Sequence, residues 1–164
     1  MNGDGVDGDE DKYEGSREDP HSRDVAAEVV ARLLRGRAGG DGVWLDVAGD
    51  SMGKALPGGS RVLVRAAGRP RLGQVWAFCD AGGQIMVHRH LRRRAGRHVF
   101  GGDANAFTDP AVPPERLIGR VIAVEVGSRR HTPSRTLACW AVLRAGSRAL
   151  IRRVRALLTT VGAR

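Results

Sequence analysis

Six short β-like runs, separated by glycine and proline, most constrain the fold of this chain. They cover residues 43–48, 61–66, 74–79, 84–92, 97–101 and 117–126. Asp80-Ala81-Gly82-Gly83 is typical of a hairpin connection, and no long helical pattern separates consecutive runs. Parallel strands would need such crossover helices. The pattern therefore predicts a mainly β fold, with a curled, mostly antiparallel sheet or a partial barrel.

The segments on either side of this β domain, which spans residues 41–127, differ from it in composition. Residues 1–21 are rich in Gly, Asp and Glu and predict a disordered acidic arm. Residues 22–40 predict a short amphipathic helix with Ser22 as its N-cap. Residues 128–164 predict a basic linker and then a C-terminal amphipathic helix over about 134–160. The expected docking stripe of the first helix is Val25, Ala26, Val29, Val30, Leu33 and Leu34.

The charge of the chain is unevenly distributed. The formal net charge is +9, although residues 1–24 hold nine acids, so the remainder is strongly basic and would attract anions. The Arg-rich C-terminal helix carries Trp140, and it could either lie on an anionic membrane or pack over the sheet. No signal peptide or membrane-spanning segment is visible. The compartment, cytoplasmic or peripheral to a membrane, stays open.

Ser51 is the first residue that suggests chemistry. It lies in Gly49-Asp50-Ser51-Met52, directly after the run 43–48 and before a Gly-rich turn. A serine at such a strand-to-loop junction can act as an exposed nucleophile if a base lies within reach. Serines in turns are more often structural, so the case depends on residues further along the chain.

Two later segments supply a base and an acid. In the run Gln84–Leu91, His88 and His90 share one face of the strand, and histidine is the commonest general base near neutral pH. Asp103 and Asp109 follow a Gly pair. Either carboxylate could orient an imidazole as the third member of a triad.

Metal or cofactor chemistry is not expected. His88, His90 and His98 have no carboxylate or cysteine at ligand spacing beside them. Cys79 and Cys139 are too few for a disulfide framework, and both stand in apolar surroundings. The two cysteines are therefore predicted to be small buried residues.

The order of several short motifs resembles the signal peptidase I / SOS-repressor superfamily of serine proteases over about residues 43–125. The motifs are Gly49-Asp50-Ser51-Met52, Val62-Leu63-Val64, Leu72-Gly73-Gln74-Val75-Trp76-Ala77-Phe78, Val87-His88-Arg89, Gly102-Asp103-Ala104-Asn105 with Asp109, Val112-Pro113 and Ile118-Gly119-Arg120-Val121. A histidine before the arginine of the fourth motif is similar to the archaeal and endoplasmic-reticulum branch of signal peptidases. The self-cleaving repressors have a lysine there.

The resemblance implies a fold and an activity. The fold would be the β domain of this protease superfamily, and the activity would be that of a serine endopeptidase that processes signal peptides. It would hydrolyse an extended peptide or pre-protein after small residues, without a cofactor. Ser51 would be the nucleophile, His88 the general base and Asp109 the orienting acid. Asp103, Met52 and Gly49 would be supporting residues.

Two alternatives remain open, because Lys54, Gly59-Ser60 and Gly49 depart from the family's usual proline, Gly-Asp and serine. One is a self-cleaving regulatory protein of the SOS-repressor type, for which Ala38-Gly39 resembles a cleavage site. The other is a catalytically decayed peptide-binding module. Nucleic acid is not an expected partner, because residues 23–40 predict one helix, too little for a helix-turn-helix.

Overall fold

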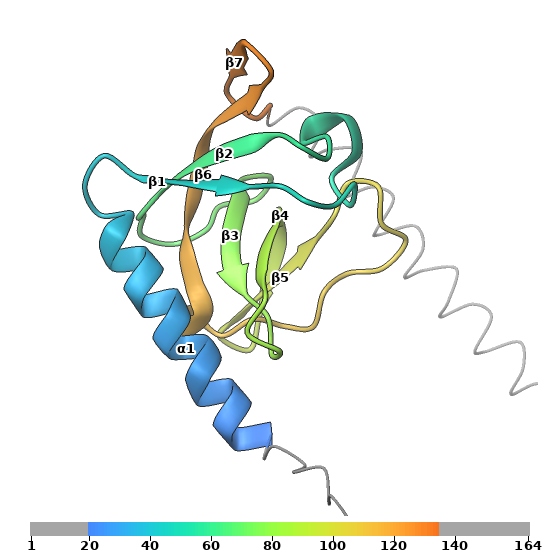
Figure 1. Ribbon diagram of the computed structural model, residues 1–164. Helices are drawn as coiled ribbons and strands as arrows, with labels where there is room; N and C mark the ends of the chain where they lie inside the picture. Colours follow the sequence, from blue (N-terminus) through green and yellow to red (C-terminus); the bar gives the residue numbers. More distant parts are fainter. Residues whose placement is uncertain (1–19, 135–164) are drawn as a thin grey trace, which may run out of the picture.

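The computed structural model describes residues 20–134, and within them the fold is mainly β (Figure 1). In this part of the chain, one antiparallel sheet of seven strands, not closed into a barrel, is accompanied by one α-helix. Most of the acidic arm and the C-terminal helix lie outside the described residues. The elements are α1 (Pro20–Arg37), β1 (Val43–Asp46), the 3₁₀ turn η1 (Gly53–Ala55), β2 (Arg61–Arg65), β3 (Val75–Cys79), β4 (Ile85–Arg94), β5 (Arg97–Gly101), η2 (Pro114–Arg116), β6 (Leu117–Val126) and β7 (Arg129–His131).

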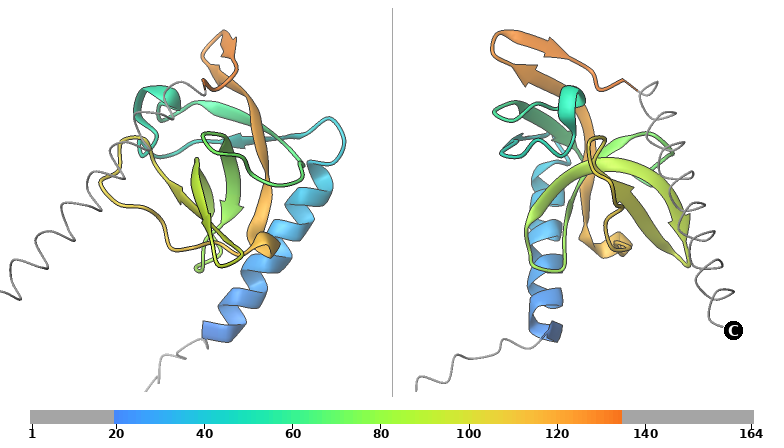
Figure 2. Two further views of the ribbon diagram at one scale, coloured as in Figure 1. Left: turned by 180° about the vertical axis from the view of Figure 1, so that it is seen from behind. Right: turned by 90° about the vertical axis from the view of Figure 1, so that its right-hand side faces the viewer.

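The strands lie in the order β1-β2-β6-β3-β4-β5, and β7 pairs with β6. Register shifts interrupt the ladders β2–β6, β3–β6 and β4–β5. Such bulges increase the local twist of a sheet, and the right-hand view of Figure 2 shows β4 bent into a pronounced arc. The predicted mostly antiparallel, curled sheet is therefore confirmed, and it stays open at its edges.

The segment 128–133 was predicted as a basic linker, and this is wrong for residues 129–131. They form β7, which pairs with the end of β6. Gly127 has a φ of +57°, a conformation that glycine adopts at little cost, and this allows the tight reversal between the two strands. The Arg130 guanidinium then lies 5.1 Å from the ring centroid of Trp44 in β1. The strand was not predictable from its Arg-rich composition, because the contact between Arg130 and Trp44 joins residues that are distant in the sequence.

Strand β3 lies at the centre of the protein and is buried on both faces. Its odd-numbered residues belong to a core that includes β2, β6 and α1, together with Met52 and Leu56. Trp76 and Phe78 belong to a second cluster with Phe100, and the Phe78 and Phe100 rings stack 4.5 Å apart. The two clusters lie on opposite sides of β3, because successive side chains alternate between faces.

Helix α1 packs against the sheet through a stripe that matches the predicted one only in Val30 and Leu34. Ala27 and Ala31 are fully buried, with Val30 and Leu34 packed beside them. Val25, Val29 and Leu33 are exposed instead. The small alanines allow close approach, and Arg35 on the flank donates to the backbone carbonyls of Pro114 and Leu117.

The predicted N-cap of α1 is also wrong. The helix begins at Pro20, so Ser22 lies within its first turn. Proline suits the start of a helix because its φ is already helical and its missing N–H would have no intrahelical partner. Among the described residues, no helix is both long and apolar enough to cross a bilayer.

Candidate active site

Three side chains predicted from the sequence form one hydrogen-bonded line. The Nε2 atom of His88 lies 2.9 Å from Oγ of Ser51, and its Nδ1 atom lies 2.7 Å from a carboxylate oxygen of Asp109. The three residues come from the loop after β1, from β4 and from the loop after β5. His88 is almost fully buried, whereas the side chain of Asp109 retains 17% exposure. This order of groups is the geometry of a nucleophile, a base and an acid that orients the base.

The proton positions follow from the chemistry of the partners. An ionised carboxylate only accepts hydrogen bonds, so Nδ1 of His88 carries the proton and donates a hydrogen bond to Asp109. In the neutral imidazole, Nε2 is then an acceptor, and the Ser51 hydroxyl donates to it. This tautomer leaves His88 able to take the proton of Ser51.

The residues on either side of Ser51 hold the nucleophile loop in place. Met52 is buried in the core next to Leu56. The carboxylate of Asp50 accepts a hydrogen bond from the Gly58 N–H at 2.9 Å, and the Asp50 carbonyl accepts one from Gly53 at 2.8 Å. Gly53, the last residue of this turn, has a φ of +51°, a left-handed conformation that glycine adopts at little cost. Because its side chain is buried in the core, Met52 anchors the loop that carries Ser51.

The loop after β5 also touches the backbone of Ser51. The Ala104 N–H donates to the Ser51 carbonyl at 2.9 Å. A Cβ atom added at Gly102 would lie 2.4 Å from that carbonyl oxygen, so only glycine fits there. No local sequence pattern indicates this role of Gly102, because the nucleophile loop is distant along the chain.

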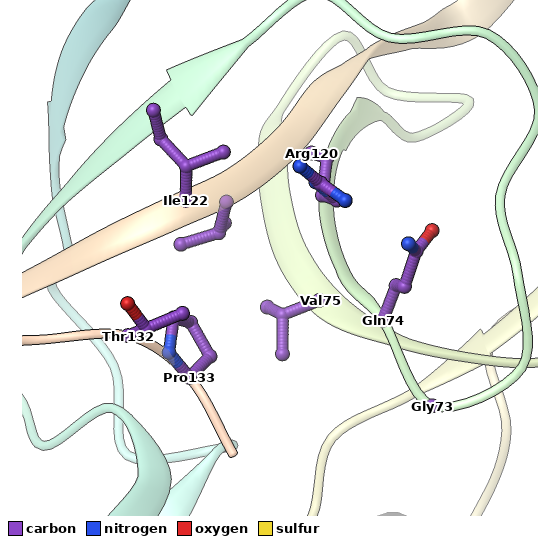
Figure 3. Close-up of a pocket in the computed structure, with 8 residues that line it drawn as sticks. Gly73, Gln74, Val75, Arg120, Ile122, Thr132 and Pro133 are labelled. Atoms are coloured by element: carbon purple, nitrogen blue, oxygen red, sulfur yellow. The ribbon is translucent and has the colours of Figure 1, made fainter. Parts of the chain in front are cut away.

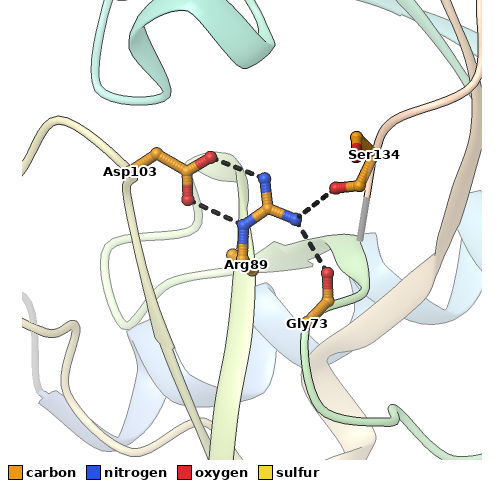
Figure 4. Close-up of polar contacts among 4 residues, drawn as sticks. All are labelled: Gly73, Arg89, Asp103 and Ser134. Carbon is orange, nitrogen blue, oxygen red and sulfur yellow. Dashed lines mark hydrogen bonds and ion pairs between the residues drawn. The ribbon is translucent and has the colours of Figure 1, made fainter. Parts of the chain in front are cut away.

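Asp103 does not touch the triad, and its partner is Arg89 (Figure 4). Arg89 is fully buried and forms a fork with both Asp103 oxygens, at 2.7 and 2.5 Å. Its remaining amine donates to the carbonyls of Gly73 and Ser134, at 2.8 and 3.2 Å. Asp103 and Asp109 therefore attach one loop to adjacent β4 residues whose side chains lie on opposite faces. The ion pair between Arg89 and Asp103 therefore positions the loop that carries Asp109, a role of Arg89 that the sequence did not predict.

Gly49 lies in the exposed stretch just before Asp50, and a Cβ added to it would meet nothing within 4 Å. Because it is a glycine, it supplies no side-chain hydrogen-bond donor to the site. The backbone N–H of Ser51 has no hydrogen-bond partner within residues 20–134. It is the donor available for a developing oxyanion at this turn.

His90, in the same strand as His88, forms a buried pair with His98 of β5. Nδ1 of His98 lies 3.2 Å from Nε2 of His90, and both rings pack against Phe100. Burial lowers the pKa of His90 below the ordinary value of 6.5. Burial also lowers the pKa of His98, with further contributions from the charges of His90, Arg93 and Arg69.

This buried pair predicts that the protein loses stability in mild acid. The unfolded chain takes up protons as the pH falls through 6.5, whereas the folded chain resists protonation because the folded-state pKa values are lower. The pair's contribution is complete above that value and decreases as the pH falls towards the folded pKa values. Urea unfolding between about pH 7.5 and 5 measures it. His98→Gln should flatten the dependence, and an unchanged pH profile in that variant would contradict the assignment.

The described residues contain no group of three or more His, Cys, Asp or Glu side chains that could hold a metal ion. Cys79 is buried as predicted, and burial raises the pKa of its thiol to about 11. Such a thiol is inert at neutral pH. Cys139 lies outside the described residues.

Comparisons with known proteins do not assign the chain to a family. A scan against protein families found no match, and neither did a search of curated proteins.

Proposed function

We propose that this protein is a serine endopeptidase related to the signal peptidase I / SOS-repressor superfamily. The observation that carries the proposal is the continuous hydrogen-bonded line from Ser51 through His88 to Asp109. An open antiparallel sheet that carries the nucleophile on a loop between two of its strands is consistent with the β domain of that superfamily. The substrate class is an extended peptide or pre-protein cleaved after small residues, as the resemblance implies.

The reaction begins when Ser51 Oγ attacks a peptide carbonyl carbon while His88 Nε2 removes the hydroxyl proton. Asp109 stabilises the imidazolium that forms and holds its ring in place. The Ser51 N–H donates to the oxygen on which negative charge develops. His88 then gives its proton to the leaving amine, and an acyl-enzyme remains on Ser51. Water, activated by the same histidine, releases the acid product.

The hydrogen-bonded line favours catalysis over a decayed peptide-binding module, since binding alone gives no reason to align three such side chains. It does not separate cleavage of other chains from self-cleavage. The bond between Ala38 and Gly39 is a poor candidate for self-cleavage, because Ala38 is buried and its carbonyl accepts a hydrogen bond from the Ala66 N–H. The suggested membrane contact involves residues 135–164, outside the described part, and stays a prediction.

A fluorophosphonate probe tests the proposal directly, because it phosphonylates a serine activated by a neighbouring base. Incubation of the full chain with the probe, followed by proteolysis and mass spectrometry, is expected to place the adduct on Ser51. Heat-unfolded protein is the control and should not react. A folded protein that gains no adduct on Ser51 would contradict the proposed activity.

A further inference from the structure

An arginine-lined hollow lies on the face of the sheet that carries His88, outside the triad. Its volume is about 440 Å³, and no acidic residue is among the described residues that line it. Trp76 and the buried Gln74 form part of its wall. The full lining is Ala67, Gly68, Arg69, Arg71, Gln74, Trp76 and Arg120, and we call it the arginine hollow.

Gln74 is held in one orientation. Its Oε1 atom accepts hydrogen bonds from Nε1 of Trp76 at 3.1 Å and from the Arg71 N–H at 2.9 Å. The side-chain NH₂ must therefore point to the other side of the amide. Figure 3 shows the amide nitrogen of Gln74 on the side of Arg120. The hollow presents hydrogen-bond donors from a buried side chain as well as from arginines.

The three arginines of the hollow form no ion pair within residues 20–134. Three other arginines of the same region do, since Arg61 pairs with Asp46, Arg89 with Asp103 and Arg116 with Asp24. Arg69, Arg71 and Arg120 are exposed. Three like charges around one hollow repel one another, and a bound anion would relieve that repulsion.

The hollow lies at a defined distance from the triad. Trp76 is paired with His88 on one side and with Arg120 on the other, so the three residues form one row across β4, β3 and β6. Directly paired residues share a face. Neighbouring strands lie about 4.8 Å apart, so the row places Arg120 roughly 10 Å from His88. That is about three residues of an extended peptide, at roughly 3.3 Å per residue.

We propose that the arginine hollow binds a carboxylate side chain of the peptide substrate, about three residues from the scissile bond. This inference rests on the proposed function, because it treats the bound peptide as substrate. A neighbouring apolar hollow shares Gln74 and Arg120 and is lined by Val75, Ile122 and Pro133 (Figure 3). A peptide with an acidic side chain next to an apolar one fits this pair of hollows better than a nucleic acid backbone does, since a duplex needs a long basic surface.

The binding test uses the full chain with Ser51→Ala, so that peptides are not consumed. Fluorescein-labelled nonapeptides of alanine and valine carry a single Glu or Gln three residues before or after the central bond. Fluorescence anisotropy is expected to show about tenfold tighter binding for Glu than for Gln on one side, as a hydrogen-bonded charge typically provides. Arg120→Ala or Arg71→Ala should remove the difference, and added salt should reduce it.

Arg97→Ala is the matched control, because this exposed arginine lies at the start of β5 and does not line the hollow. It should keep the Glu preference. No preference at either position would overturn the inference. So would a single-stranded oligonucleotide that binds through Arg120 while the peptides are not distinguished.

Cleavage by the unmodified chain separates this inference from the proposed function. Hydrolysis of Glu and Gln peptides at equal kcat/KM would overturn the inference and leave the endopeptidase in place. A Glu preference in binding without any Ser51-dependent hydrolysis would keep the hollow as a carboxylate site and overturn the proposed function.

Discussion

Replacement of either Ser51 or His88 by alanine is expected to lower kcat/KM for an extended peptide by about a million-fold, to the background rate. Ser51→Ala removes the attacking oxygen, and His88→Ala removes the group that accepts its proton at 2.9 Å. The two residues act as a unit, so the double variant should be no less active than either single variant. Peptide cleavage followed by mass spectrometry measures the three rates.

Two matched controls lie within the same chain. Ser60 has a buried hydroxyl without a hydrogen-bond partner among residues 20–134, so Ser60→Ala should leave the rate unchanged. His131 is an exposed histidine in β7, and His131→Ala should also have no effect. The assignment fails if Ser51→Ala retains the rate of the unmodified chain, or if the control variants lose activity as the triad variants do.

Removal of the Asp103 carboxylate is expected to have the largest effect on stability. Asp103→Ala leaves the fully buried guanidinium of Arg89 without its counter-charge, which typically costs about 3–5 kcal/mol of unfolding free energy. It also removes one of the two side-chain attachments between β4 and the loop that carries Asp109. Peptide cleavage should fall together with stability, since the orienting acid is then poorly placed. Urea denaturation followed by circular dichroism gives the free energy.

The ion pair between Arg61 and Asp46 is the matched control for this prediction. Their side chains are 51% and 89% exposed at an N–O distance of 3.3 Å. Asp46→Ala should therefore change the unfolding free energy by no more than about 1 kcal/mol. Equal losses for Asp46→Ala and Asp103→Ala would show that the buried pair contributes no more than a surface one.

The strands were predictable because their signals are local. Alternation and Gly/Pro punctuation located the strand segments from 43 to 126 within a few residues, and Asp80 to Gly83 form the predicted hairpin. Local signals did not predict the elements whose formation or buried face depends on tertiary contacts. β7 depends on pairing with β6, and α1 buries alanines because the sheet surface requires close packing.

The candidate site divides in the same way. The sequence by itself determined which groups are present: a serine in a tight turn, a histidine in a strand and two aspartates in one loop. Only the tertiary structure decided which aspartate meets which partner. His88 and Arg89 are adjacent in β4 and point to opposite faces, so Asp109 reaches the histidine while Asp103 reaches the arginine. That division, and the approach of Gly102 to the Ser51 carbonyl, depends on contacts between residues distant in the sequence, which no local pattern encodes.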